Sequence, residues 1–294
     1  MARYEWSETF MSVEGEAKYT GWPTVYIRFS RCNFQCRGFN NPNNVDTTSA
    51  KILGFDPRTV WSLENLPPIH TGCDSIYSWD EKFSHLWHTG NENELANEVI
   101  KVLPYNSWIN PRTGQHVILS LTGGEPTLRI KFWPELLNTE QFKNVKHVLI
   151  ETNCSVPLKE KYIEQLFNWA LSRHAKVTWS NSPKLSRSGE KWEDAIRPEI
   201  AAMQMFNGGN GIFEQYFKFV CAPTESDFDE VEKAMQAYYS AGIKQDVEVY
   251  IMPVACLEEQ QKEIAAQVAR MCIDRGYIYC HRVQNSVFNN GPGT

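Results

Sequence analysis

Three of the eight cysteines lie in loop-like sequence, and their spacing could support metal chemistry. Cys32 and Cys36 stand four positions apart directly after an apolar run, and residues 37–72 separate them from Cys73. Three thiolates can hold an iron-sulfur cluster and leave one iron open to a cofactor or substrate. A zinc site on Cys32 and Cys36 is the alternative, although no second cysteine pair or histidine pair with suitable spacing follows. We expect the remaining cysteines to pack as small hydrophobic residues: Cys154, Cys221, Cys256, Cys272 and Cys280.

The composition indicates one globular domain that acts on a small molecule. A chain of 294 residues with 42% hydrophobic content can bury a large core, so we expect a single domain over residues 1–294. The formal net charge of -6 argues against direct nucleic-acid binding, which relies on clustered Lys and Arg. The sequence shows no secretory leader and no apolar run long enough for a membrane span, so we expect a cytoplasmic protein with reduced thiols.

Short apolar runs alternate with helical patterns along most of the chain. The apolar runs predict strands at 24–31, 116–121, 145–151, 176–180, 216–220, 247–252 and 277–282. The helical patterns cover 92–103, 131–142, 158–172, 226–241 and 257–275. This alternation is typical of right-handed βα units, so the predicted fold is α/β, an open or partial parallel βα barrel. Functional residues of such folds gather in loops at the carboxyl ends of the strands.

Residues 37–91 break this rhythm. They are rich in Pro, Asn, Asp and Trp, and they show little periodicity. A loop of this length inside a domain is usually functional or disordered, and the aromatic content argues against disorder. We therefore interpret the segment as a long insertion after the first predicted strand.

Arg28, Arg282 and Gln284 are candidates for contacts with a substrate. The guanidinium of Arg28 has the fork geometry that binds carboxylates, whereas a charge that faces water is the alternative. Arg282 and Gln284 follow the last predicted strand and point the same way along an extended chain. We expect them to face a pocket together or, alternatively, to form an ordinary polar face of the sheet.

Several of these segments resemble the radical S-adenosylmethionine (SAM) superfamily and, within it, the 7-carboxy-7-deazaguanine synthase family. The cluster motif of the superfamily is CxxxCxxC, and Phe39 occupies the position of its third cysteine here. The family's continuation CDTxxTW is matched further on by Cys73-Asp74-Ser75 and Trp79. The resemblance therefore implies a 4Fe-4S cluster on three thiols in a CX3CX36C pattern: Cys32, Cys36 and Cys73.

The resemblance extends to motifs near both ends and in the middle of the chain. Residues 10–23 are similar to the family's FxTxQGEG and TGxP segments, 121–126 to GGEP, 151–155 to ETxG without its glycine, 182–184 to SPK and 282–284 to RxQ. It implies an open barrel of the radical SAM type, with SAM contacts from Gly123, Gly124, Glu125, Thr152, Ser182 and Lys184. It implies substrate contacts from Glu14, Gly15, Arg28, Thr122, Arg282 and Gln284. A solvated surface charge is the alternative for Lys184.

The resemblance also implies a magnesium ion. Ser75 and Asp74 would provide the oxygen ligands that a hard cation prefers, and an ordinary turn is the alternative for this pair.

The implied reaction is a radical ring contraction. The cluster and SAM would generate a 5'-deoxyadenosyl radical that abstracts a hydrogen from 6-carboxy-5,6,7,8-tetrahydropterin, and the ring would rearrange to 7-carboxy-7-deazaguanine with loss of ammonia. This step belongs to the biosynthesis of queuosine-type 7-deazapurines. The partners would be the small pterin, an external flavodoxin-like electron donor and a second copy in a homodimer. The alternatives are a radical SAM activase that makes a glycyl radical on a partner, and a non-catalytic metal-binding relative.

Overall fold

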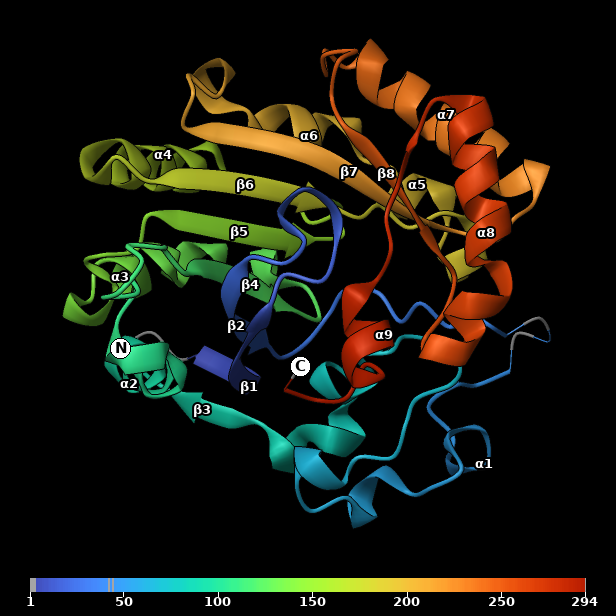
Figure 1. The fold of residues 1–294 in the computed structure, drawn as a ribbon, viewed down its shortest axis with the longest axis horizontal. Helices are drawn as coiled ribbons and strands as arrows, with labels where there is room; N and C mark the ends of the chain where they lie inside the picture. The colour runs from blue at the N-terminus through green and yellow to red at the C-terminus, as the bar shows by residue number, and fades with distance from the viewer. Residues whose placement is uncertain (1–3, 42, 44, 294) are drawn as a thin grey trace.

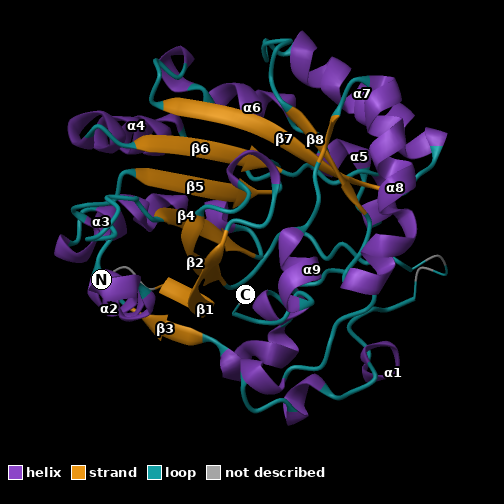
Figure 2. Cartoon of the chain, viewed as in Figure 1, coloured by secondary structure: helices purple, strands orange, loops and turns teal. Residues whose placement is uncertain are grey.

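The computed structural model describes residues 4–41, 43 and 45–293, so the ends of the predicted domain, 1–3 and 294, lie outside the described residues. Within that range the strands form a single nine-stranded sheet in the order β3-β1-β2-β4-β5-β6-β7-β8-β9 (Figures 1 and 2). Every pairing from β2 through β9 is parallel, whereas β1 pairs antiparallel with β2 and with β3. The strands are β1 Tyr4–Val13, β2 Pro23–Phe29, β3 His88–Gly90, β4 Ile118–Gly123, β5 His147–Thr152, β6 Lys176–Asn181, β7 Phe213–Cys221, β8 Val249–Pro253 and β9 Ile278–Tyr279.

Helices connect the parallel strands and bury the apolar side of the sheet. Side chains of the sheet share one core cluster with Leu95 of α2, Ile163 of α4 and Val231 of α7. The helices are α1 Ala50–Leu53, α2 Glu92–Val102, α3 Trp133–Leu137, α4 Glu160–Arg173, α5 Trp192–Ala195, α6 Pro198–Gln204, α7 Glu225–Ser240, α8 Glu258–Arg275 and α9 Val283–Phe288. This βα order confirms the prediction of an α/β fold with an open parallel sheet, because β3 and β9 lie at opposite edges.

Two predictions of local structure were wrong. Strand β1 was missed because its acidic residues obscure the apolar alternation; Glu5 pairs with Arg31 and Arg129. The helix predicted over 131–142 is only the short α3. At its end the side-chain amide of Asn138 and the hydroxyl of Thr139 donate to the carbonyls of Pro134 and Leu136 and cap the helix.

The segment 37–91 folds against the sheet as a set of short helical turns. Its described part has its own apolar cluster, built from Leu53, Val60, Ile69, Ile76, Tyr77 and Phe83. Strand β3 at its end pairs with β1 and extends the sheet. The insertion is therefore attached at the antiparallel edge of the molecule.

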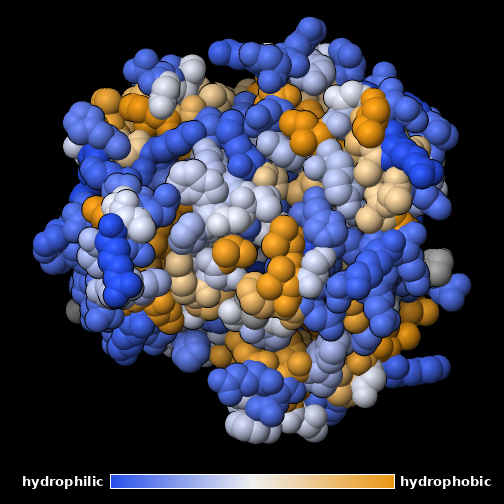
Figure 3. All heavy atoms as spheres, viewed as in Figure 1, coloured by the Kyte–Doolittle hydropathy of each residue, from blue (hydrophilic) through white to orange (hydrophobic). Residues whose placement is uncertain are grey.

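The surface around these elements is mixed. Hydrophilic residues cover most of the rim of the face in Figure 3, and hydrophobic residues gather toward its centre. No helix in the described ranges combines the length and the apolar character that a membrane crossing requires.

Candidate active site

A cavity of about 240 Å³ lies across the carboxyl ends of the parallel strands. This volume is several times the share of one water molecule, so the cavity is more than a packing defect. Its lining comes from the ends of β2, β4, β5, β6, β7 and β8, from the insertion and from the C-terminal segment. Every predicted site residue except Glu125 lines it.

The loop that carries Cys32 and Cys36 is fixed by polar contacts on both sides. The carboxylate of Glu190 accepts hydrogen bonds from the amides of Gln35 (2.9 Å) and Cys36 (2.7 Å). Cys36 has a φ of 49°, which is the left-handed region, so its backbone conformation depends on such support. The loop therefore holds both thiols at the cavity wall.

The insertion leaves this loop and returns to it at the same place. The amide of Gly72 donates to the carbonyl of Phe39 at 2.7 Å. Phe39 occupies the position of the missing third cysteine, and Gly72 directly precedes Cys73, so this bond joins the two places in the chain. Cys73 then packs with Cys32 and Cys36 in one cluster that also contains Phe34 and Phe39. Three thiols that are distant in sequence thus line a single cavity.

Burial determines the protonation of these thiols. It raises the pKa of Cys32 to about 12 and raises the pKa of Cys36 and of Cys73 above the usual range of a thiol. Hydrogen bonds to the sulfurs are long: the Phe34 amide lies 3.3 Å from the Cys32 sulfur and the Ser75 hydroxyl 3.7 Å from the Cys73 sulfur. Metal binding would deprotonate the thiols, because the ligand is the thiolate.

The three thiols are candidate ligands for a metal cofactor. Within the described ranges, no group of three or more His, Cys, Asp or Glu side chains is arranged so that it could hold a metal ion. A cluster bonds each thiolate to a different iron, so its ligands surround a cube and do not converge on one point. Three thiols at one end of a cavity, with the remaining space beside them, fit this donor set: Cys32, Cys36 and Cys73.

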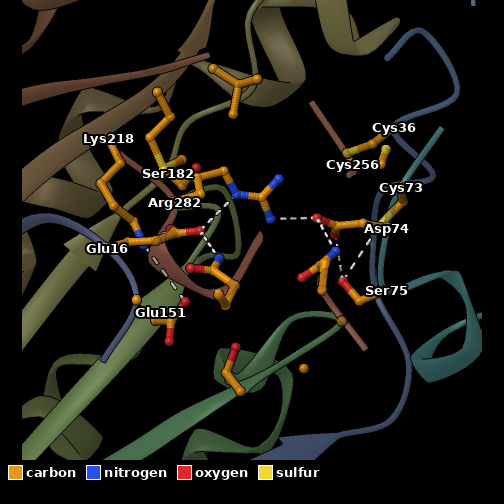
Figure 4. Close-up of a pocket in the computed structure, with 18 of the residues that line it drawn as sticks. Glu16, Cys36, Cys73, Asp74, Ser75, Glu151, Ser182, Lys218, Cys256 and Arg282 are labelled. Carbon is orange, nitrogen blue, oxygen red and sulfur yellow. Dashed lines mark hydrogen bonds and ion pairs between the residues drawn. The ribbon is translucent and has the colours of Figure 1, made fainter. Parts of the chain in front are cut away.

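A fourth cysteine, Cys256, lies at the same end of the cavity. It follows β8, and Figure 4 shows it beside Cys36 and Cys73. Its thiol points to the carbonyl of Gly72 at 3.9 Å, and burial raises its pKa to about 12. The sequence analysis assigned Cys256 to packing because the strand-like sequence around it gave no sign of a cavity.

The glycines after β4 allow two backbone segments to meet. A side chain on Gly124 would place its Cβ 2.2 Å from the carbonyl oxygen of Arg31, just before the cysteine loop. The Glu125 amide donates to that same carbonyl at 2.9 Å. Gly123 and Gly124 therefore bring the end of β4 against the loop that carries Cys32.

Glu125 itself lies beneath the cavity wall. Its side chain is fully buried, and its oxygens accept hydrogen bonds from the hydroxyl of Thr152 (2.8 Å) and the amide of Asn153 (2.7 Å). The structure therefore places Glu125 beside Thr152, another predicted contact of SAM, but not on the lining of the cavity. The Glu125 side chain supports the turn that carries Thr152, and Thr152 does line the cavity.

Ser182 and Lys184 extend this side of the cavity. The Ser182 amide donates to the carbonyl of Thr152 at 2.8 Å, and the Lys184 ammonium lies 3.2 Å from the Ser182 hydroxyl. Lys184 lines the cavity and is not a fully solvated surface charge. The residues predicted to contact SAM, apart from Glu125, thus line one cavity.

The opposite end of the cavity holds a buried charge cluster that the sequence analysis missed. Lys218 of β7 is 2% exposed, and its ammonium lies 2.7 Å from Glu16 and 3.6 Å from Glu151 (Figure 4). Burial would lower the pKa of Lys218, but Glu16 and then Glu151 outweigh it and raise that pKa. Lys218 was detectable, because a lysine within an otherwise apolar predicted strand needs a buried partner.

Glu14 stands beside this cluster in a different charge state. The Tyr26 hydroxyl donates to its carboxyl group at 3.0 Å. Burial, with a further contribution from Glu151, raises the pKa of Glu14 to about 8. In contrast, Lys218 and then Arg282 overcome the effect of burial on Glu16 and lower its pKa. A protonated and an ionised carboxyl group thus lie in one short loop.

Arg28 is oriented toward the cavity by its neighbours. Its Nε donates to Glu8 at 2.6 Å, the Tyr77 hydroxyl donates to the same carboxylate at 2.8 Å, and the rings of Phe10 and Tyr77 flank the guanidinium. Among the described residues, no hydrogen bond is recorded for its two terminal nitrogens. The prediction that Arg28 offers a fork to a carboxylate is compatible with this arrangement.

The C-terminal segment brings Arg282 and Gln284 to the cavity in a backbone conformation that differs from the expected one. They are not on an extended chain, because α9 begins at Val283. Both side chains donate to Glu16, Arg282 at 3.0 Å and Gln284 at 2.7 Å. A side chain on Gly15 would overlap the Gln284 amide, so Gly15 makes room for this contact.

Asp74 and Ser75 do not fit the expected magnesium site as they stand. Arg282 Nη2 donates to Asp74 Oδ2 at 2.6 Å, and Asn290 approaches the same oxygen at 3.5 Å. The hydroxyl of Ser75 turns to the other oxygen of Asp74 at 3.3 Å. An arginine therefore already occupies one of the two Asp74 oxygens that a divalent cation could use.

The fold and the site together define a class: an open α/β sheet with a thiol-lined cavity at the carboxyl ends of its strands. No family model matches the chain. It is similar over most of its length to curated proteins named 7-carboxy-7-deazaguanine synthase. It is 23% identical to the one from Methanopyrus kandleri, covering 87% of this chain and 83% of that protein. It is 25% identical to the one from Rhodopirellula baltica, covering 98% and 88%, and 22% identical to the one from Halobacterium salinarum, covering 98% and 91%.

One solved structure is also similar. The crystal structure of QueE from Escherichia coli aligns with 96% of this chain and 94% of that chain, at a TM-score of 0.48 and 16% sequence identity.

Proposed function

We propose that the chain is a radical SAM enzyme that converts 6-carboxy-5,6,7,8-tetrahydropterin to 7-carboxy-7-deazaguanine with loss of ammonia. The named relatives support this reaction class over nearly the full length of the chain. The observation that carries the proposal is the hydrogen bond from Gly72 to Phe39, because it returns Cys73 to the loop of Cys32 and Cys36. An insertion that leaves and re-enters at one point preserves a three-thiol site across residues 37–72.

Under this proposal the two ends of the cavity have different tasks. Cys32, Cys36 and Cys73 would hold a 4Fe-4S cluster, which with bound SAM and an external electron donor supplies the 5'-deoxyadenosyl radical. The turn of Thr152, with Ser182 and Lys184 beside it, would orient SAM next to the thiols. The chain itself would then exclude water and hold the substrate so that only one hydrogen faces the radical.

The charged end suits the polar edges of a carboxylated pterin. The fork of Arg28 would bind the substrate carboxylate. The carboxyl groups of Glu14, Glu16 and Glu151 offer acceptors for the N–H groups of a pterin ring, and Lys218 pairs with Glu16 and Glu151. Protonated Glu14 can also donate, which lets the site match both donors and acceptors on one edge of the ring.

The test is a turnover assay under anaerobic conditions. The chain is reconstituted with iron and sulfide and incubated with SAM, a reductant and the carboxylated pterin, and 7-carboxy-7-deazaguanine is measured by mass spectrometry together with 5'-deoxyadenosine. We expect both products, and we expect Arg28→Met to lose the deazaguanine while still binding the cluster. An iron-replete wild-type chain that forms 5'-deoxyadenosine but no deazaguanine would contradict the proposed substrate.

A further inference from the structure

Arg282 links the charged end of the cavity, at Glu16, to Asp74 beside Cys73 of the thiol end. Its backbone is held on both sides by one side chain: the Arg282 amide donates to Gln261 Oε1 at 3.0 Å, and Gln261 Nε2 donates to the Arg282 carbonyl at 3.2 Å. Gln261 belongs to α8 and is fully buried. The place of the guanidinium is therefore set by a helix of the core and not by a flexible tail.

The guanidinium bridges three separate parts of the chain. Nη2 donates to Asp74 of the insertion at 2.6 Å, Nε donates to Glu16 of the N-terminal loop at 3.0 Å, and Nη1 donates to the carbonyl of Ala255 after β8. Figure 4 shows Arg282 between Glu16 and Asp74, with Ser75 on the far side of Asp74. These bonds use only part of the donor capacity of a guanidinium, and the side chain still lines the cavity.

This arrangement conflicts with a divalent cation at the same carboxylate. A magnesium ion needs several oxygen ligands in a near-octahedral shell, and Asp74 Oδ2 is already bonded to an arginine. An ion on that oxygen would be placed next to a permanent positive charge in a buried site, where repulsion is weakly screened.

We infer that Arg282 supplies the positive charge at Asp74 and that this chain does not bind Mg²⁺ at Asp74 and Ser75. Arg282 lines the cavity and keeps N–H groups that these bonds do not use, so it can donate to an anionic oxygen of the bound substrate. This second part rests on the proposed function, whereas the exclusion of the cation does not. Arg282 is thus a positioning and charge-supplying residue in place of a metal.

The exclusion is tested by direct binding of Mn²⁺, a paramagnetic probe for Mg²⁺ sites. Reconstituted protein with an oxidised, diamagnetic cluster is titrated with Mn²⁺, and free Mn²⁺ is measured by electron paramagnetic resonance, with and without SAM and the carboxylated pterin. We expect no stoichiometric site in the wild type. We expect Arg282→Met to gain one site per chain and the double variant Arg282→Met/Asp74→Asn to lose it again. Arg275→Met, which removes an arginine on the outer side of α8 that pairs with Glu225 and Asp229, is the matched control and gains none.

Two results would overturn the inference. The first is one Mn²⁺ per wild-type chain that disappears in Asp74→Asn. The second is a folded Arg282→Met protein without an Asp74-dependent site. Arg282→Lys is the control for a general disturbance of the fold at this position. It keeps a positive charge, so it is expected to exclude Mn²⁺ as the wild type does. These results do not depend on turnover, so a failed product assay leaves them interpretable.

Discussion

The two ends of the cavity differ in how their polar groups are satisfied. At the charged end, Lys218 and Arg282 both bond to Glu16, and each bond is 3.0 Å or shorter. At the thiol end, the recorded hydrogen bonds of Cys32 and Cys73 range from 3.3 to 3.9 Å. Sulfur is a weak hydrogen-bonding group, so these contacts contribute little.

The difference indicates two kinds of preorganisation. The charged end is assembled by the fold itself, so its geometry should persist whatever is bound and its loss should destabilise the chain. The thiol end is held mainly by its backbone, through Glu190 and the bond between Gly72 and Phe39. Substitutions there should affect metal binding more than folding.

Replacement of Lys218 is expected to have the largest effect on stability. Lys218→Met removes the ammonium that pairs with Glu16 and Glu151 and leaves only Arg282 bonded to Glu16 among these cations, and breaking a buried ion pair from one side costs about 3–5 kcal/mol of unfolding free energy. Urea unfolding of the cluster-free protein measures this. Lys262→Met is the control, because Lys262 is 68% exposed and pairs with Glu258 on the same helix, so its change should stay within about 0.5 kcal/mol. Equal effects of the two substitutions would remove the distinction between the cavity ends.

Glu14 is expected to make stability depend on pH. Because its pKa is raised to about 8, the folded chain retains a proton that the unfolded chain releases near its ordinary pKa. The stabilisation from this proton is complete below the unfolded pKa and is lost as pH rises through about 8. Glu14→Gln has no such proton to release, so we expect it to flatten the fall in unfolding free energy across this range. The flattening should amount to a few kcal/mol, because each tenfold difference in proton affinity between the folded and unfolded chain corresponds to about 1.4 kcal/mol. The measurement is urea unfolding at a series of pH values, and an unchanged slope in Glu14→Gln would contradict the assignment.

Removal of Glu190 is expected to have the smallest effect on stability. Glu190→Ala leaves the amides of Gln35 and Cys36 without their acceptor, at a cost of about 1–3 kcal/mol. Glu190→Gln retains an acceptor oxygen and serves as the matched control. We expect the alanine variant to reconstitute with less iron per chain than the glutamine variant, as measured by iron and sulfide analysis. If Glu190→Ala lost more unfolding free energy than Lys218→Met, the thiol end and not the charged end would contribute more to stability, which contradicts this expectation.

Much of the fold could be predicted because strands β4 to β8 each contain a short apolar run, and helical patterns separate most of them. What could not be predicted depends on distant partners. Strand β1 contains acidic residues whose arginines lie elsewhere in the chain, and residue 256 faces the cavity only because β8 ends there. The pairing of Asp74 with Arg282 spans most of the sequence, and nothing local to either residue indicates it.

The central claim is that Cys73 completes a cluster site with Cys32 and Cys36, and iron content after anaerobic reconstitution tests it most directly. The account predicts that Cys73→Ala loses its iron and sulfide, whereas Cys256→Ala, which removes the neighbouring thiol, retains both. An iron-replete Cys73→Ala protein with the visible absorption of the wild-type cluster would contradict it.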